Sequence, residues 1–465
     1  MVLTFIIITF LPLVESLSRV KGFILLFIIS CIFGFTQVRK KIKFDLLEYI
    51  FLCFLIVSAI STYYSWSFSL SLAELLRYTS YFLIFTSLRR FNLSSKYYFF
   101  AILFFSYSLF YTVINPLIRE SVRFDNYRQA WEGFRLSPIF GTGPDTFGYV
   151  SIRFAPDQRY FVKNASNYFL QLFAETGIIG GILFFLLIIF SIIRIFKLRL
   201  YKKDNFHYIL FVGTMVLIVV NFVENIWKNI SLFLFFWIIL SMFLPIRITL
   251  KRRSIISKSI FNLLFTLILI TALTYSTGKF LFFLAKNNYM SIKTLQIAGI
   301  LIPWEAKQQQ DIATVALSNG YLMNQYDYVR KYNNLALTLD PLNSSYHLFR
   351  ANFENEVNEY LTARDYFIKA IFLKPPGNDE IYRKLSTTYT KEAQKYYAEG
   401  NTLKSKKILL EQQKIYPYMI SIHIENDYHS KKAIGDVIAY VARKTETYQF
   451  LARNLTRSYN ILKKM

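Results

Sequence analysis

The sequence predicts an all-α protein in two parts: a polytopic membrane helix bundle of about nine spans, followed by an extracytoplasmic α-solenoid. The hydrophobic fraction is 54% of 465 residues, and these residues gather in long runs over positions 1–285. The formal net charge is +25, with basic residues gathered between the runs. Residues 286–465 are more polar and contain an internal repeat. In a soluble protein this charge would indicate nucleic acid, but the apolar blocks exclude that class, and we expect the lipid bilayer as partner.

The apolar runs give the positions of the spans, although several are shorter than the roughly 20 residues that a bilayer requires. The first run has no charged flank or cleavage site typical of a signal peptide, so we interpret it as a signal anchor or a truncated span. The nine expected spans are Val2–Val14, Val20–Phe35, Leu46–Ile60, Leu70–Leu88, Tyr97–Leu117, Asn167–Phe196, Tyr208–Phe222, Ile230–Leu244 and Ile260–Leu284.

Basic residues fall on alternate connections between these spans, while the connection Ser61–Ser69 has no charge. The basic connections lie at 39–43, 89–96, 194–203 and 247–258. Because such connections stay in the cytoplasm, we expect a plasma membrane protein with a cytoplasmic N-terminus. A large loop at 118–166 and the whole of 286–465 are then extracytoplasmic. The two cysteines, Cys31 and Cys53, both lie in apolar runs, which excludes a disulfide framework and a cysteine zinc site.

The C-terminal part repeats itself when Tyr326–Pro341 is laid on Tyr360–Pro375. Six residues coincide at an offset of 34, the period of tetratricopeptide repeats, which this part resembles over about 130 residues. Looser copies flank the pair at Ile292–Pro303 and Leu403–Pro417, and we expect closing helices in Ser430–Lys464. Such a stack offers a concave surface for a protein partner. The alternative is that it only folds over the outer face of the membrane part.

Several kinds of catalytic site are absent from the sequence. It contains no Gly-x-x-x-x-Gly-Lys phosphate loop, no His-Glu-x-x-His and no Asp-x-Asp. Its four histidines are scattered, and none lies in the loop 118–166. We therefore expect neither a metal nor a cofactor.

The external loop concentrates arginines, whose planar guanidinium matches phosphate oxygens. A cluster of this kind at the outer face suits a lipid-linked diphosphate, and the alternative is a solvated loop with internal salt bridges. The arginines are Arg119, Arg123, Arg128, Arg135, Arg153 and Arg159, set against Glu120, Asp125, Glu132, Asp145 and Asp157.

The order of residues in and after this loop is distinctive. Arg123-Phe-Asp-Asn-Tyr-Arg128 is followed by Pro138-Ile-Phe-Gly141-Thr-Gly143-Pro-Asp145-Thr-Phe and then by Asn167-Tyr-Phe-Leu-Gln with Glu175-Thr-Gly. This stretch resembles the O-antigen ligase and polymerase superfamily of multi-span glycosyltransferases. The resemblance implies an undecaprenyl-diphosphate-linked glycan as donor, held by outer-face arginines. It carries the loop arginine onto Arg123, with Arg128 beside it.

Two glycines and a proline predict a tight turn at the centre of this motif, at Gly141 and Gly143. The turn would bring backbone close to a ligand, and Asp145 or Asn167 would position the acceptor. The resemblance also implies a histidine as base beside the asparagine, where this chain has Ser166. A serine hydroxyl is no base near neutral pH without help, so Asp145, Asp157 or Glu175 would replace it.

The resemblance implies a second arginine near the outer end of an earlier span, and Arg77 is the only one in Leu70–Leu88. An ionisable group within a span is a functional candidate, but Glu74, three residues earlier, is also placed to neutralise it. Glu175 lies two to three turns into its span. It would orient Arg77 or an acceptor, or else pair with another helix.

These features predict a glycosyltransferase of the O-antigen ligase type that transfers a glycan to an acceptor lipid, glycan or protein during cell-surface polysaccharide assembly. A polysaccharide polymerase fits equally, because the two differ mainly in the acceptor. A rival of another class is a catalytically inactive binder of the lipid-linked glycan that serves as an assembly scaffold, which Ser166 favours. A transporter is a weaker choice, since paired broken spans with midplane charges are not apparent in the sequence.

Overall fold

The computed structural model describes residues 19–38, 42–90, 123–154, 161–199, 202, 205–244, 255–286, 292–318, 326–373 and 379–412. Within these ranges every regular element is a helix and no strand occurs. The described residues form two compact units, the first up to Val150 and from Lys163 to Glu305, the second comprising Ser151–Val162 and the chain from Ala306. The expected spans Val2–Val14 and Tyr97–Leu117 and the closing helices in Ser430–Lys464 lie outside the described residues.

Seven expected spans fall on helices of the first unit. Among the described residues, three helical stretches are long and apolar enough to cross a membrane: Leu46–Tyr63, Tyr168–Lys197 and Ile256–Lys286. The other four helices are shorter or carry charges, so the structure supports a helical membrane bundle without establishing nine spans. The seven helices are α2 (Arg19–Val38), α3 (Leu46–Tyr63), α4 (Phe68–Leu88), α8 (Tyr168–Lys197), α9 (Asn205–Val220), α10 (Ile230–Phe243) and α11 (Ile255–Lys286).

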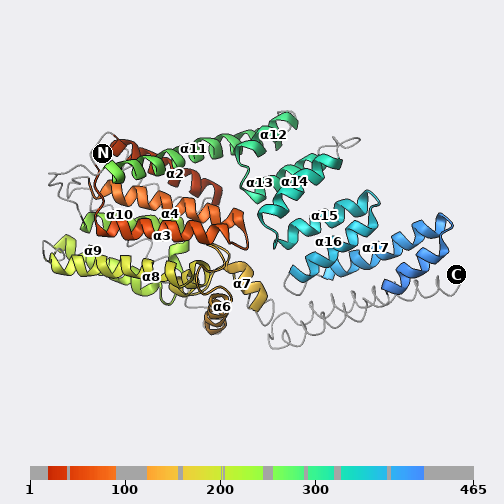
Figure 1. Cartoon of the computed structure of the whole chain (residues 1–465), viewed down its shortest axis with the longest axis horizontal. Coiled ribbons are helices and arrows are strands. Elements are labelled where there is room, and N and C mark those ends of the chain that lie inside the picture. Colours follow the sequence, from red (N-terminus) through yellow and green to blue (C-terminus); the bar gives the residue numbers. More distant parts are fainter. Residues whose placement is uncertain are drawn as a thin grey trace. The chain divides into compact units, whose positions relative to one another are not determined.

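Helices α3 and α4 form an antiparallel pair at the centre of this unit (Figure 1). Asp45 caps α3 in a capping box with Glu48, and Ser67 caps α4. Helix α3 also packs on α8, and α4 on α2, α10 and α11. Aromatic rings fill the space between them, with Phe51 stacked on Trp237 at 4.6 Å between ring centroids. Almost all of α4 is buried, which explains why it tolerates polar residues that a lipid-facing helix would not.

One end of α3, α4 and α8 is joined by a network of ion pairs that we call the basic-end cluster. Arg89, whose side chain is fully buried, and Arg194 both contact the Asp45 carboxylate at 2.5 Å. Arg90 contacts Glu48 at 2.5 Å. The arginine side chains therefore link the end of α4 and the end of α8 to the start of α3. The cluster consists of Asp45, Glu48, Arg89, Arg90 and Arg194.

Helix α8 is broken at Gly177, where φ is 69° and ψ is −172°. This conformation is open only to glycine, and a Cβ added there would lie 2.1 Å from the carbonyl oxygen of Ile139. The backbone groups freed by the break are satisfied by the chain before Asp145. Thr142 N–H donates to Ala174 O, Gly143 N–H to Glu175 O, and Ile178 N–H to Pro138 O.

The first unit extends to Glu305, beyond the expected boundary at 285. Helix α12 (Ile292–Leu301), which the sequence suggested as a loose repeat, packs on α11. The ring of Tyr275 in α11 stacks on Trp304 at 5.7 Å, and Lys279 forms an ion pair with Glu305. These contacts hold the chain up to Glu305 against α11.

The second unit is built from consecutive helices, of which α13 packs on α14, α15 on both α14 and α16, and α16 on α17. Helix α16 begins 34 residues after α14 (360 − 326) and ends 34 residues after it (373 − 339), in agreement with the repeat offset. Arg330 in α14 pairs with Glu354 of the next helix at 2.7 Å, and its repeat equivalent Arg364 pairs with Glu392 of the next helix at 3.0 Å. The helices are α13 (Ala306–Ser318), α14 (Tyr326–Leu339), α15 (Ser344–Glu356), α16 (Tyr360–Leu373), α17 (Asp379–Ala398) and a further helix at 402–412.

Candidate active site

The described part of the loop 118–166 contains two helices, α6 (Arg123–Leu136) and α7 (Phe147–Phe154), joined by the turn around Gly141 and Gly143. Both glycines have positive φ, 74° and 108°. A Cβ at Gly141 would lie 2.2 Å from the Glu175 backbone, and one at Gly143 2.1 Å from Ser65 Oγ. The turn is thus pressed against α8 and the end of α3, and it delivers Asp145 beside them.

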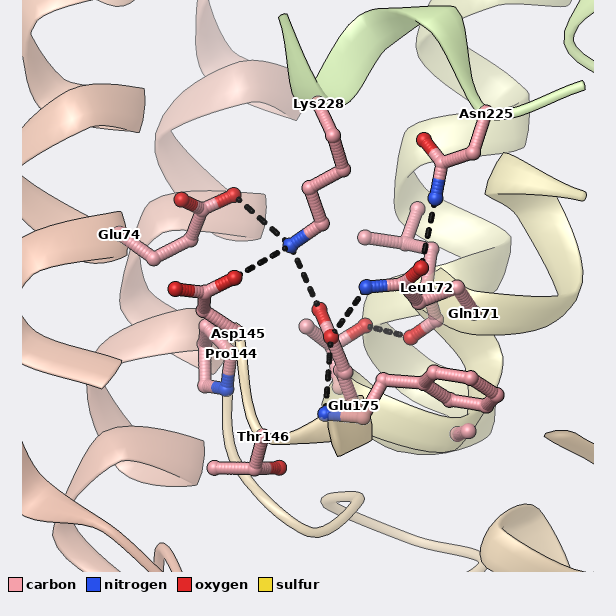
Figure 2. Close-up of polar contacts among 12 residues, drawn as sticks. Glu74, Pro144, Asp145, Thr146, Gln171, Leu172, Glu175, Asn225 and Lys228 are labelled. Atoms are coloured by element: carbon pink, nitrogen blue, oxygen red, sulfur yellow. Dashed lines mark hydrogen bonds and ion pairs between the residues drawn. The ribbon is translucent and has the colours of Figure 1, made fainter. Parts of the chain in front are cut away.

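Lys228 lies at the centre of the site, surrounded by three carboxylates (Figure 2). Its ammonium is 3.2 Å from Asp145, 3.4 Å from Glu175 and 3.5 Å from Glu74. The three acids come from three different elements: α4, the turn and α8. Lys228 itself belongs to a short 3₁₀ turn, η7 (Ile226–Lys228), between α9 and α10.

A hydrogen-bond network fixes the Glu175 side of this cluster. Glu175 accepts hydrogen bonds from the Gln171 amide at 2.6 Å and from Phe147 N–H at 3.3 Å. Gln171 in turn accepts from Ala165 N–H at 2.9 Å. It also accepts from the Asn225 amide at 2.6 Å (Figure 2). The carboxylate of Glu175 is therefore fixed in orientation by the chain before α8 and by the chain before η7.

Arg77 lies beside this cluster, enclosed in the protein. Its guanidinium forms an ion pair with Glu74 and donates to Lys228 O at 3.0 Å, and its side chain is 4% exposed. The neutralising contact with Glu74, expected as the alternative role of Arg77, is therefore present. The side chain is anchored in the fold and oriented toward the η7 backbone.

Arg123 has different surroundings at the start of α6. It pairs with Glu224 at 2.8 Å, and the two side chains are 21% and 28% exposed. Arg128 is exposed on the same helix. Asn126, about one turn after Arg123, donates to Ser166 Oγ at 3.0 Å, and Ser166 is half-buried. Asn167 caps α8 by accepting from Leu170 N–H, and it also donates to Phe222 O at 2.8 Å.

The segment 221–229 is the common element of these contacts, and the sequence analysis did not single it out. Arg77, Asp145 and Glu175 all contact Lys228, while Arg123 contacts Glu224 and Asn167 contacts Phe222. Five expected site residues therefore meet one segment of nine residues. The available signal was the sequence Glu224-Asn-Ile-Trp-Lys228-Asn, whose charged and amide residues separate two strongly apolar runs. This connection lies on the side of the bundle predicted to be opposite the basic connections.

The charges divide the site into two parts. The buried part holds three carboxylates against two basic side chains, Lys228 and Arg77. This excess of negative charge disfavours the binding of a further anion there. Burial lowers the pKa of Lys228, but Glu175, Glu74 and Asp145 outweigh this effect and the pKa is raised, so the ammonium stays charged near neutral pH. The partly exposed part presents Arg123 and Arg128. Within the described ranges, no group of His, Cys, Asp and Glu side chains is arranged to hold a metal.

Comparison with known proteins relates part of the chain to a family. Residues 4–185 match a family model described as O-antigen ligase. This range includes Arg77, Arg123, Asp145 and Glu175 and ends before the segment 221–229. Searches of curated proteins and of solved structures found no match. The similarity supports the superfamily indicated by the loop motifs and, together with the apolar helices, a membrane protein with a glycan-handling function of the O-antigen ligase or polymerase type.

Proposed function

We propose that this protein is a membrane glycosyltransferase that moves a glycan from an undecaprenyl-diphosphate carrier to the hydroxyl of an acceptor at the outer face of the plasma membrane. The observation that carries the proposal is the convergence of Arg77, Arg123, Asp145, Asn167 and Glu175 on the segment 221–229. The match to O-antigen ligases over residues 4–185 supports the reaction class.

Arg123 is the residue that we assign to the donor diphosphate, with Arg128 contributing charge from the same helix. Its guanidinium is partly exposed and forms an ion pair with the Glu224 carboxylate at 2.8 Å, which supports its assignment to an oxyanion. Arg77 is less suited to direct contact, because Glu74 and the Lys228 carbonyl occupy its guanidinium. We therefore assign Arg77 to positioning Lys228 and Glu74.

Asp145 is the group that we assign to the acceptor. In the reaction the acceptor oxygen attacks the anomeric carbon, and the bond from that carbon to the diphosphate oxygen breaks. The electron pair of that bond leaves with the diphosphate, and the hydroxyl proton passes to the Asp145 carboxylate. Ser166 is half-buried and accepts a hydrogen bond from Asn126, and Asn167 caps α8. We assign both to lining the acceptor side rather than to taking the proton.

The experiment compares Arg123→Ala with Arg135→Ala in membranes supplied with undecaprenyl-diphosphate glycan and acceptor. Arg135 lies on the same helix, is 63% exposed and pairs only weakly with Glu132, so it is a matched control for loss of one α6 arginine. We expect transfer to fall by roughly 10²-fold or more in Arg123→Ala, because one donor to the developing negative charge is removed. Transfer by Arg135→Ala should equal that of wild type.

Protein abundance is measured in the same membranes, so that loss of transfer is not confused with loss of protein. Transfer by Arg123→Ala at the wild-type rate would refute the assignment of the donor site. Retention of the lipid-linked glycan by wild type, without transfer to any acceptor, would instead identify the catalytically inactive binder. Extension of the donor glycan itself would identify a polymerase.

A further inference from the structure

Lys228 brings three carboxylates from distant parts of the chain to one ammonium. The ammonium has three N–H donors, and one carboxylate from each of three elements lies within 3.5 Å. Its side chain is 9% exposed. Bringing several ions together out of water costs several kcal/mol per ion, and well-packed apolar side chains would stabilise the same junction at least as well. The cluster therefore calls for a reason other than stability.

The three acids are not equivalent. Glu74 is also held by Arg77, and Glu175 by Gln171 and Phe147 N–H, and both side chains are 1% exposed. The side chain of Asp145 is 7% exposed, which makes it the most exposed of the three acids. Asp145 also has a positive φ of 62°, a strained conformation for a residue other than glycine. Such strain persists where the surroundings enforce it, and functional sites are where it gathers.

We propose that Lys228 is a positioning residue that holds the Asp145 carboxylate in its ionised form and oriented toward the acceptor hydroxyl. This inference rests on the proposed function and deepens it. Lys228 fixes Asp145 from the segment 221–229, while the turn at Gly141 and Gly143 fixes it from the backbone side. The carboxylate then serves as base in the step written above, and Lys228 keeps its own proton throughout.

The other charged and titratable groups around Lys228 and Asp145 determine how each substitution changes the ionisation of Asp145. They are Glu74, Arg77 and Tyr81 from α4, and Tyr168 and Glu175 from α8. Removal of the ammonium leaves Asp145 facing two carboxylates, which disfavours its ionised form. Removal of the negative charge of Glu74 has the opposite effect.

The test measures glycan transfer against pH in membranes containing the full chain. In Lys228→Met we expect kcat to fall by roughly 10²-fold with donor KM unchanged. The acidic limb of the profile should move up by about one pH unit or more, the shift typical for loss of an adjacent opposite charge. Lys228→Arg should restore the wild-type limb. Lys279→Met, which removes a lysine ion pair elsewhere in the same unit, is the matched control and should leave the limb in place.

Glu74→Gln supplies a second, opposite expectation, because its acidic limb should move to lower pH. If the acidic limb of Lys228→Met stays at the wild-type pH, the inference is overturned and Lys228 has only a structural role. The same conclusion follows if the Lys228→Arg profile equals that of Lys228→Met. If the Lys228→Met protein does not accumulate, Glu74→Gln provides the test alone. An acidic limb that stays in place or moves to higher pH in Glu74→Gln overturns the inference. Absence of transfer by the wild-type chain refutes the proposed function and this inference together, whereas an active wild type with unmoved limbs refutes this inference alone.

Discussion

Two arginines of the site differ in what surrounds them, and that difference determines what each can bind. The side chain of Arg77 is 4% exposed and is held by Glu74, so a phosphate would have to displace a buried carboxylate. Arg123 is 21% exposed, and its carboxylate partner Glu224 is 28% exposed. Exchange of one anion for another is far less costly at Arg123, because water replaces part of the lost contact.

The pair Arg123–Glu224 leads to a prediction about donor affinity. In the proposed reaction Glu224 competes with the donor diphosphate for the Arg123 guanidinium, so Glu224→Gln should lower the donor KM. A partly exposed ion pair is worth about 1 kcal/mol at most, which limits the decrease to about five-fold. KM is measured with the undecaprenyl-diphosphate glycan as the varied substrate. Glu132→Gln, which removes a partly exposed acid from α6, the helix of Arg123, is the control and should leave KM unchanged. An increase in KM for Glu224→Gln would contradict a competing role.

How far the site could be predicted from sequence follows from the distance along the chain between its members. The Glu74–Arg77 contact is local, since residues three apart share a helix face, and it was expected. Lys228 lies 154, 83 and 53 residues from Glu74, Asp145 and Glu175. No helical period links positions so far apart, and no motif marks the segment 221–229. Only the folded bundle brings Lys228 to the acids.

At the scale of elements, the broken helix α8 links the turn that carries Asp145 to the helix that carries Glu175. The sequence predicted a span from Asn167 to Phe196, and α8 runs from Tyr168 to Lys197 with Asn167 as its cap. No feature of the sequence predicted the break at Gly177. Hydropathy reports that a helix is apolar, whereas the break depends on Ile139 approaching from a distant part of the chain.

The break predicts a strong effect of Gly177→Ala. The added methyl would lie 2.1 Å from Ile139 O, and the alanine would have to adopt a φ of 69°. We expect a loss of at least about 2 kcal/mol in stability, seen as a lower midpoint of thermal unfolding in detergent. Gly400→Ala is the control, because its φ of 78° is similar but no atom lies within 4 Å of an added Cβ. Equal midpoints for the two variants would show that the contact with the turn contributes nothing beyond backbone strain.

The repeat helices show the opposite case, in which local pattern was sufficient. Tyr326–Pro341 and Tyr360–Pro375 were aligned by sequence alone, and α14 and α16 begin at Tyr326 and Tyr360. Short helices packed on their sequence neighbours depend on contacts within a few tens of residues, which a period reveals. The assignment of Ile292–Pro303 as a further copy has no comparable support, since α12 packs on α11 instead.

At the scale of the first unit, ionic groups gather at both ends of the same three helices. The basic-end cluster joins the start of α3 to the ends of α4 and α8, and the candidate site joins the end of α3 to the starts of α4 and α8. From Ile178, just beyond the break, to Arg194, α8 rises about 24 Å at 1.5 Å per residue, comparable with the thickness of a bilayer's hydrocarbon core. We therefore expect the two clusters to lie at opposite surfaces of the membrane.

This spacing predicts the orientation of the protein. The basic-end cluster adjoins the Lys- and Arg-rich connections, so we expect it at the cytoplasmic face and the candidate site outside. Tyr64 at the site end of α3 and Leu198 at the basic end of α8 are 65% and 54% exposed, so single cysteines there are open to reagent. In a background with Cys31 and Cys53 replaced by Ser, a membrane-impermeant maleimide should label Tyr64→Cys in intact cells, but Leu198→Cys only after permeabilisation. The reverse pattern would place Asp145 and Lys228 in the cytoplasm, where an outer-face acceptor cannot reach them.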